Sequence, residues 1–258
     1  MSETGIQKNV GNLEALISYC KSYKEKYKPS NPNITLAALE KLHETIKDKV
    51  IGEIKAKKKV QAVGNERAAA FRGLPVFATQ IMNGLISSGA DEAKIADANE
   101  HNRKIQGSAA GQNKEDQEEE NPADAEPKVA ASAEGDAGDR KGSRSTSQQS
   151  FDNKIIHFTK LIETIETEPK YQPNEPEYSL NALTEKLQLM NDANKVAKDA
   201  TAEWSQMLID RNKCFNDDET GLVHLGLLVK THVKYIYKSR SQEYKHISKL
   251  KFVKIKER

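Results

Sequence analysis

The stretch YKPSNPNITLAAL at residues 27–39 is matched by YQPNEPEYSLNAL at residues 171–183. Both stretches carry a tyrosine, two prolines, a hydroxyl residue and two leucines, and every equivalent pair is 144 residues apart. Arg67 and Arg211, further along the chain, keep the same separation. A constant internal offset is typical of a duplicated structural unit. The sequence therefore predicts two homologous helical units.

Each of these stretches is predicted to form an extended corner that leads into a helix. Proline removes a backbone donor and disfavours helix at the residue before it, so the proline pairs should end the preceding helix. Thr35 and Ser179 follow the second proline of each pair by three positions. Their hydroxyl groups are suited to accept from free N–H groups of the next turn, which predicts an N-cap at each position.

A long helix is predicted after each corner, because apolar residues recur at steps of three and four over residues 36–71 and 180–215. This spacing is typical of the seam of an antiparallel bundle or coiled coil. The composition, rich in Lys, Glu, Ala, Leu and Gln, also favours helices over a large sheet. Shorter helices are predicted at residues 10–27, 74–86, 91–105, 155–165, 222–237 and 241–250. We therefore expect an all-α fold that forms an elongated antiparallel helical bundle.

The composition changes abruptly over residues 106–150, where the only branched aliphatic side chain is Val129. Such a segment buries too little apolar surface to offset the entropy of ordering it. We expect a first helical unit at residues 1–105, a long disordered charged linker at residues 106–150, and a second helical unit at residues 151–258.

Polar residues interrupt the apolar stripes of the two long helices. Glu53 and Lys57 lie on the first stripe, so we expect a bend or solvent exposure there, unless the other unit or another chain completes the seam. Arg67 and Arg211 also lie on the stripes, which predicts buried guanidinium groups that pair with a carboxylate or a carbonyl, or that reach to the bundle edge. An anion pocket is the functional alternative for these two arginines.

Motifs of catalysis and metal binding are missing from the sequence. His43 is followed by Lys47 where an HExxH helix needs its second histidine, and no glycine-rich phosphate loop is present. Cys20 and Cys214 lie among helical residues and are expected to behave as small apolar side chains. We therefore expect no enzyme, no cofactor and no metal site. Without a secretory signal or a transmembrane segment, a reducing, cytoplasmic location is expected.

The C-terminal stretch is the strongest binding candidate. From Lys230 onward, ten Lys or Arg residues face only Glu243 and Glu257. The candidate binding residues are Lys234, Tyr235, Tyr237, Lys238, Arg240, Tyr244, Lys245, Lys249, Lys251, Phe252 and Lys254. Cations mixed with aromatic rings bind nucleic acid by neutralising phosphates and stacking on bases, and they also dock on acidic proteins or anionic lipids. A structural interpretation, with tyrosines packed inward and lysines solvated, competes with these.

The two YxPxxP corners, the RxxxF helix ends, QQSFDN at residues 148–153 and the closing KYIYK and YKHISKLKF resemble a family of bacterial proteins of unassigned function. The resemblance implies a bacterial, cytoplasmic helical protein and brings no catalytic residue or ligand. We expect a non-enzymatic helical scaffold or protein-interaction protein, which binds an unknown protein partner or associates with itself. The alternatives are a nucleic-acid-associated protein that binds through the C-terminal region, and a membrane-active, toxin-like protein.

Overall fold

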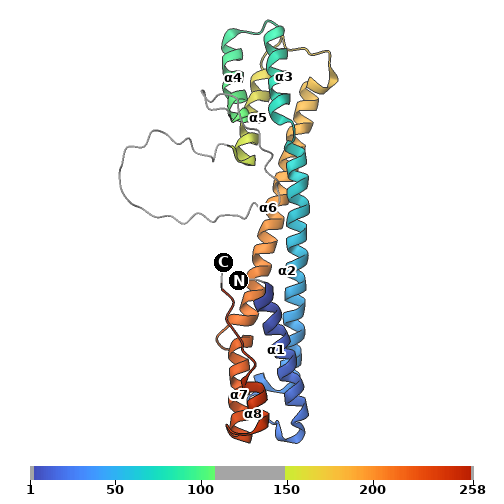
Figure 1. Ribbon diagram of the computed structural model, residues 1–258. Helices are drawn as coiled ribbons and strands as arrows, with labels where there is room; N and C mark the ends of the chain where they lie inside the picture. Colours follow the sequence, from blue (N-terminus) through green and yellow to red (C-terminus); the bar gives the residue numbers. More distant parts are fainter. Residues whose placement is uncertain (1–2, 108–148, 257–258) are drawn as a thin grey trace, which may run out of the picture. The chain divides into compact units, whose positions relative to one another are not determined.

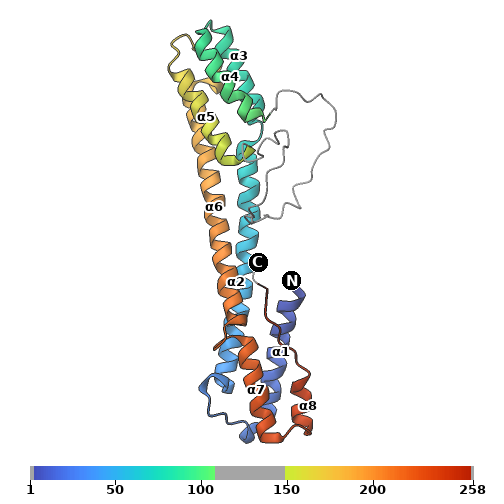
Figure 2. The same cartoon turned by 90° about the vertical axis from the view of Figure 1, so that its left-hand side faces the viewer.

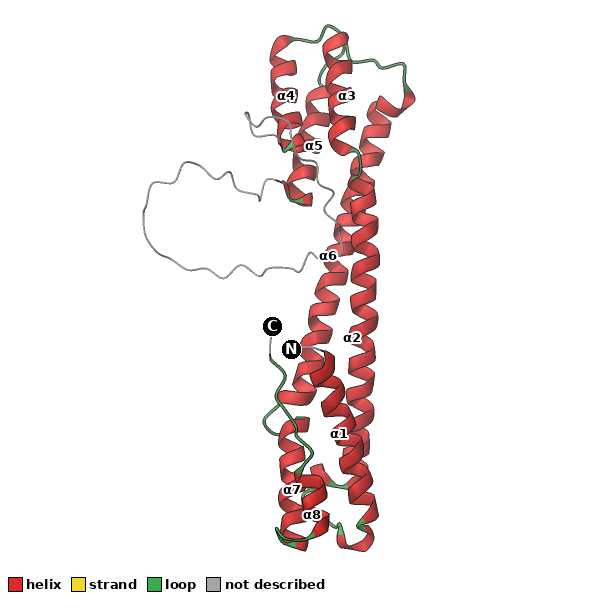
Figure 3. Ribbon diagram, in the orientation of Figure 1, coloured by secondary structure: helices red, strands yellow, loops and turns green. Residues whose placement is uncertain are grey.

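The computed structural model describes residues 3–107 and 149–256, and within them the fold is all-helical, without a strand (Figure 3). The chain divides into two compact units. Unit 1 combines the residues up to 67 with those from 195 onward, and unit 2 comprises residues 68–194. Each compact unit therefore takes helices from both of the predicted sequence repeats.

Unit 1 is built from helices of both ends of the chain (Figures 1 and 2). Its elements are α1 (Glu3–Ser22), the 3₁₀ helix η1 (Lys24–Lys26), the first part of α2 (Leu36–Phe71), the last part of α6 (Leu180–Asn216), α7 (Leu222–Tyr237) and α8 (Gln242–Ser248). They share one buried apolar core, which includes Leu13, Leu16, Cys20, Ile46, Phe215, Leu225, Val229 and Val233. Residues more than 200 positions apart in the chain thus meet in a single core.

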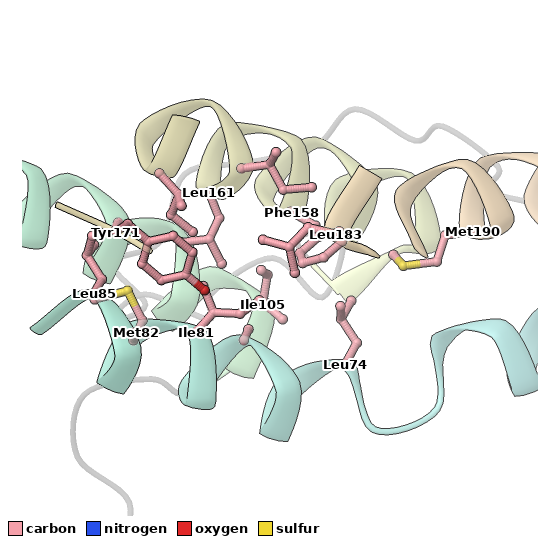
Figure 4. Close-up of a cluster of buried hydrophobic side chains, with 14 of the residues drawn as sticks. Leu74, Ile81, Met82, Leu85, Ile105, Phe158, Leu161, Tyr171, Leu183 and Met190 are labelled. Carbon is pink, nitrogen blue, oxygen red and sulfur yellow. The ribbon is translucent and has the colours of Figure 1, made fainter. Parts of the chain in front are cut away.

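Unit 2 packs α3 (Leu74–Ser87) and α5 (Phe151–Glu166) against α4 (Glu92–Gln106), together with the end of α2 and the start of α6. Its core draws side chains from all of these helices and from the second corner (Figure 4); they include Leu74, Ile81, Met82, Leu85, Ile105, Phe158, Leu161, Tyr171, Leu183 and Met190. α3 is the most apolar of these helices, which fits its central place in the core.

The two proline corners are closed in the same way. Their turns are the 3₁₀ helices η2 (Pro32–Ile34) and η4 (Pro176–Tyr178). The buried hydroxyl group of Tyr27 donates to the carbonyl of Ile34 at 2.6 Å, and Tyr171 donates to the carbonyl of Tyr178 at 3.1 Å. Each tyrosine spans seven residues and satisfies a carbonyl that the extended corner would otherwise leave unpaired. The repeated tyrosine therefore holds the corner in this conformation, and we refer to its hydrogen bond as the tyrosine lock.

The N-caps predicted at the two corners are confirmed. The Thr35 hydroxyl accepts from the N–H of Ala38, and the Ser179 hydroxyl accepts from the N–H of Ala182, each at 3.3 Å. Each hydroxyl also donates back to a proline carbonyl of its own corner, at 3.0 Å for Thr35 and 2.7 Å for Ser179. One side chain thus ends the corner and begins the long helix.

The exposure predicted at Glu53 is wrong. Its side chain is only 12% exposed, because the last part of α6 covers this position and completes the seam within unit 1. Lys57, one turn later, is exposed as expected. Helix α2 runs without a break through both positions. Of the three outcomes considered for this interruption, completion by the other sequence repeat is therefore the one observed.

The predicted linker is ordered at both of its margins. Gln106 belongs to α4, and its side-chain amide donates to the carbonyl of Pro75 at 2.6 Å. Ser150 caps α5 by accepting from the N–H of Asn153 at 3.2 Å. Residues 108–148, the bulk of the predicted linker, lie outside the described residues.

Replacing Tyr27 or Tyr171 with phenylalanine is expected to lower the free energy of unfolding by about 1–2 kcal/mol, because the corner carbonyl loses its donor. Urea denaturation followed by circular dichroism measures the change. Tyr235→Phe is the control, since this side chain is 83% exposed and should give no change. An equal loss in the control would contradict the lock.

Cleaving the chain within residues 108–148, at an inserted protease site, is expected to leave the two halves associated. Both compact units need helices from both halves, so separating the halves would expose both cores. Size-exclusion chromatography of the cleaved protein should give one species in native buffer and two in denaturant. Two species in native buffer would show that each half packs by itself.

Candidate functional site

The candidate binding residues lie on α7, on α8 and on the segment that follows, all within unit 1. The face of α7 that meets the core carries Leu222, Leu225, Val229 and Val233. These residues recur at steps of three and four, so the opposite face is exposed, and it carries Leu227 and Tyr235 beside polar side chains. The short helix α8 is capped by Ser241, whose hydroxyl accepts from the N–H of Tyr244, and it is anchored by the buried Ile247.

Six of the candidate residues are exposed cations, and we refer to them as the cationic C-terminal region: Lys234, Lys238, Arg240, Lys245, Lys249 and Lys251. None of the six forms a salt bridge within the part of the chain that the structure describes. The ammonium group of Lys234 lies 6.0 Å from the centre of the Tyr244 ring. Lys254 differs from the six, because it pairs with Asp218 at 2.9 Å. Acidic side chains of the described structure therefore leave the charge of these six cations unpaired, so it is available to a binding partner.

The aromatic candidates divide into packed and free rings. Tyr237 packs on Tyr23, with ring centres 5.1 Å apart, and Phe252 lies against the backbone of Gly226. Tyr244 is half-buried, whereas Tyr235 is 83% exposed. Base stacking needs an open aromatic face. Of the four predicted rings, Tyr235 offers one most fully.

Beside this region is an open surface pocket of about 700 Å³. It is lined by Tyr19, Ser22, Tyr23, Lys24, Glu25, Lys26, Tyr237, Gln242, Glu243 and His246. Tyr19 stacks on His246 with ring centres 5.6 Å apart, and the ammonium group of Lys26 lies 5.4 Å from the centre of the Tyr237 ring. The end of α1 together with η1 therefore supplies six of the ten lining residues, and the C-terminal helices supply the other four.

Two hydroxyl groups in this pocket are engaged with the backbone. Ser22 donates to the carbonyl of Tyr19 at 2.7 Å, and Tyr23 donates to the carbonyl of Glu243 at 3.0 Å. Burial, with smaller contributions from neighbouring groups, raises the pKa of Tyr23 to about 12. The Tyr23 hydroxyl therefore remains protonated at neutral pH, and its bond joins the segment after α1 to α8.

Arg211 is buried in the contact between α2 and α6. Its guanidinium group lies 3.2 Å from a carboxylate oxygen of Glu53, and the two side chains are 11% and 12% exposed. The Trp204 indole donates to the other Glu53 oxygen at 3.0 Å. One carboxylate thus satisfies two large polar side chains, as a buried charge requires. Arg67, the equivalent of Arg211 in the first stripe, is half-buried.

The cysteines and histidines lie in structural surroundings. Cys20 is fully buried, and desolvation raises the pKa of its thiol to about 12, so the reactive thiolate is suppressed. Desolvation also raises the pKa of the half-buried Cys214. Across residues 3–107 and 149–256, no group of three or more His, Cys, Asp or Glu side chains is placed to hold a metal ion. None of the described helices has the length and apolar character needed to cross a lipid bilayer.

Comparisons of the chain with protein-family models, with curated proteins and with solved structures found no match. What this surface can do must therefore follow from its own residues. Tyr237, one of the candidates found in the sequence, meets Tyr23 and Lys26, which were not predicted as binding residues. Tyr23 was visible only as one member of a helical stripe, and no sequence pattern links it to Glu243, 220 residues away.

Replacing Arg211 with methionine is expected to lower the free energy of unfolding by about 3 kcal/mol, because Glu53 is left as a buried, unbalanced charge. The double variant Glu53→Gln, Arg211→Met should lose less, since no unpaired charge remains. Lys59→Met is the control, because the Lys59–Glu203 pair is largely exposed and should contribute less than about 1 kcal/mol. Additive losses in the double variant, measured by urea denaturation, would contradict the pairing.

Proposed function

We propose that this protein is a non-enzymatic helical interaction protein, and that its cationic C-terminal region contacts an acidic surface of a protein partner. The observation that carries the proposal is the set of six exposed cations without a salt bridge in the described structure. Exposed charge of one sign speeds encounter with an oppositely charged surface and helps to set its orientation. Lys234 lies on α7 and Lys245 lies on α8, so these helices hold the backbone of two of the six cations in place, which limits the entropy lost on binding.

A nucleic-acid partner is the second candidate, and Tyr235 is the observation that favours it. This ring is 83% exposed and directly follows Lys234, an arrangement suited to base stacking beside a phosphate contact. Against it, Tyr237 and Phe252 are used in packing, so a continuous stacking platform is missing among the described residues of this region. We therefore rank an acidic protein surface first.

We also propose that the chain arose by internal duplication, and that it works in the cytoplasm of a bacterium, as its family resemblance implies. The two tyrosine-locked corners support the duplication, since they repeat the same hydrogen bonds at the same offset. Lys59 and Glu203 add to this: they are 144 residues apart, hence equivalent in the two repeats, and they form a salt bridge with each other. Contact between equivalent positions is typical of an isologous interface.

The test compares two triple variants with the same charge change. One reverses the C-terminal cations (Lys234→Glu, Lys238→Glu, Lys245→Glu), and the control reverses exposed lysines of α2 (Lys47→Glu, Lys55→Glu, Lys58→Glu). Fluorescence polarisation is measured with a labelled polyglutamate peptide and with a labelled single-stranded oligonucleotide, each at low and high salt. Polyglutamate should bind the unmodified protein at low salt and bind the first variant at least about tenfold more weakly.

The other results each have a defined meaning. Equal weakening in the α2 control would show general charge attraction and would overturn the C-terminal assignment. Absence of binding to both probes at low salt would overturn the proposed function. Tighter binding of the oligonucleotide, lost in Tyr235→Ala, would replace the protein partner with nucleic acid.

A further inference from the structure

The last described segment, residues 250–256, is extended and lies along α1, α6 and α7 of unit 1 (Figures 1 and 2). We call it the strap. The residues that hold it form the strap seat, namely Asn9, Asn12, Asn216, Gly226 and Lys230. None of the seat residues belongs to the cationic C-terminal region, so the seat is a separate feature of the molecule.

Two asparagines hold the strap by its backbone, each through two hydrogen bonds. The Asn9 amide donates to the carbonyl of Val253 at 2.8 Å and accepts from the N–H of Val253 at 3.1 Å. Asn216 makes the same pair of bonds with Ile255, at 2.6 and 2.7 Å. A side-chain amide offers one acceptor and two donors, so it can replace the edge of a neighbouring strand. Backbone contacts of this kind do not depend on the side chains of the bound segment.

Two further contacts extend the same pattern towards the start of the strap. The Asn12 amide donates to the carbonyl of Lys251 at 2.7 Å, and the ammonium group of Lys230 donates to the carbonyl of Leu250. Burial lowers the pKa of Lys230, as expected for a cation enclosed by this contact. Positions 251, 253 and 255 alternate along the strap, which is how an extended peptide is bound at a sheet edge, and Leu250 adds one bond outside this alternation.

The side chains of the strap supply the specificity. The Phe252 ring lies over Gly226, where an added Cβ atom would come within 2.6 Å of the ring, so only glycine leaves this space. Ile255 is buried at 6% exposure, whereas Val253 is 54% exposed. Lys254 points to Asp218 at 2.9 Å. The seat therefore selects an aromatic residue and, three positions later, an aliphatic residue, while the exposed pair with the neighbouring Asp218 adds a weaker preference for a basic residue between them.

We propose that the strap seat is a peptide-docking site, which the protein's own strap fills in cis, and that it receives an extended segment of a partner protein with this aromatic-x-basic-aliphatic pattern. The strap behaves as a ligand, since it has no regular structure of its own and, from Lys251 onward, side chains of the seat bond its backbone at positions 251, 253 and 255. Its own side chains then mark what a partner segment must offer.

A partner segment fits better than the strap of a second copy. A tethered strap competes at an effective concentration of about 1 mM, so an identical strap from another molecule gains nothing at ordinary protein concentrations. A partner segment that also contacts the protein outside the seat gains additional binding free energy. This additional energy allows it to compete with the tethered strap. Displacement of the strap would at the same time release α1 from the C-terminal segment, because Asn9 and Asn12 both belong to α1.

The test uses a labelled peptide with the sequence of residues 249–256 and two forms of the protein, the full chain and a chain that ends at Lys249. Fluorescence polarisation should show binding to the shortened chain, and binding to the full chain weaker by at least about 100-fold. Asn9→Ala with Asn216→Ala, or Gly226→Ala alone, should abolish binding to the shortened chain. Asn65→Ala and Gly64→Ala are matched controls on α2, where Asn65 is exposed and Gly64 has open space around it.

A second measurement covers the case in which the shortened chain does not fold. Hydrogen exchange of the full chain is followed with excess unlabelled peptide, and exchange at Val253 and Ile255 should rise as the strap is displaced. A peptide with its phenylalanine and isoleucine replaced by alanine is the control. A folded shortened chain that fails to bind, or strap exchange unchanged at saturating peptide, would overturn the proposal. Concentration-dependent dimers that exchange their straps would replace the partner with a second copy.

Discussion

The buried carboxylate of Glu53 joins α2 to α6 within unit 1 through two polar contacts. It accepts from the Trp204 indole and pairs with the Arg211 guanidinium, so two large polar side chains of α6 are satisfied by one residue of α2. A buried charge is tolerated only with such partners. A shift of one residue between the helices would separate all three groups. The contact therefore favours one alignment of α2 and α6, and the other contacts of this helix pair depend on that alignment.

The same alignment explains the exposed ion pairs nearby. Lys49 meets Asp210 at 2.8 Å and Lys59 meets Glu203 at 2.6 Å, both between α2 and α6. These pairs are too exposed to contribute much stability, but they favour the antiparallel register over a shifted one. The small residues Ala197 and Ala200 pack against Val63 in the same stretch, so the helices approach closely there. Apolar packing gives the stability, and charge selects the register.

The side chains of the C-terminal stretch divide into a set that packs in the core and a set that is exposed to solvent. Its inward side chains, Phe252, Ile255 and Ile247, complete the core of unit 1, whereas its lysines from Lys234 onward are exposed. Binding and structural interpretations of a basic, aromatic sequence are therefore not exclusive, because different residues of one stretch serve each. Lys254 illustrates the division: predicted as a binding residue, it pairs with Asp218 next to the strap.

Local patterns predicted the long helices closely, since residues 36–71 and 180–215 correspond to Leu36–Phe71 and Leu180–Asn216. They also predicted the corner caps and the C-terminal cations. They did not predict that Tyr27 and Tyr171 lock the corners, because the bonded carbonyls carry no side-chain pattern. Glu53 was misjudged for a related reason: an acidic residue on an apolar stripe looks exposed until its cationic partner on another helix is known.

The sequence by itself determined the two long helices, their N-caps and the repeated corner, since these follow from periodicity, proline and hydroxyl capping within a few residues. The first helix was placed less well, because it was predicted at residues 10–27 and α1 spans Glu3–Ser22. Only the tertiary structure decided which helices share a core. It placed each repeat's helices with those of the other repeat, joined Asn9 to Val253 across 244 residues, and assembled a pocket from α1, α7 and α8. Contacts between residues so far apart in the sequence depend on the burial of whole helix faces against one another. A local sequence pattern does not indicate which helix will cover a given face.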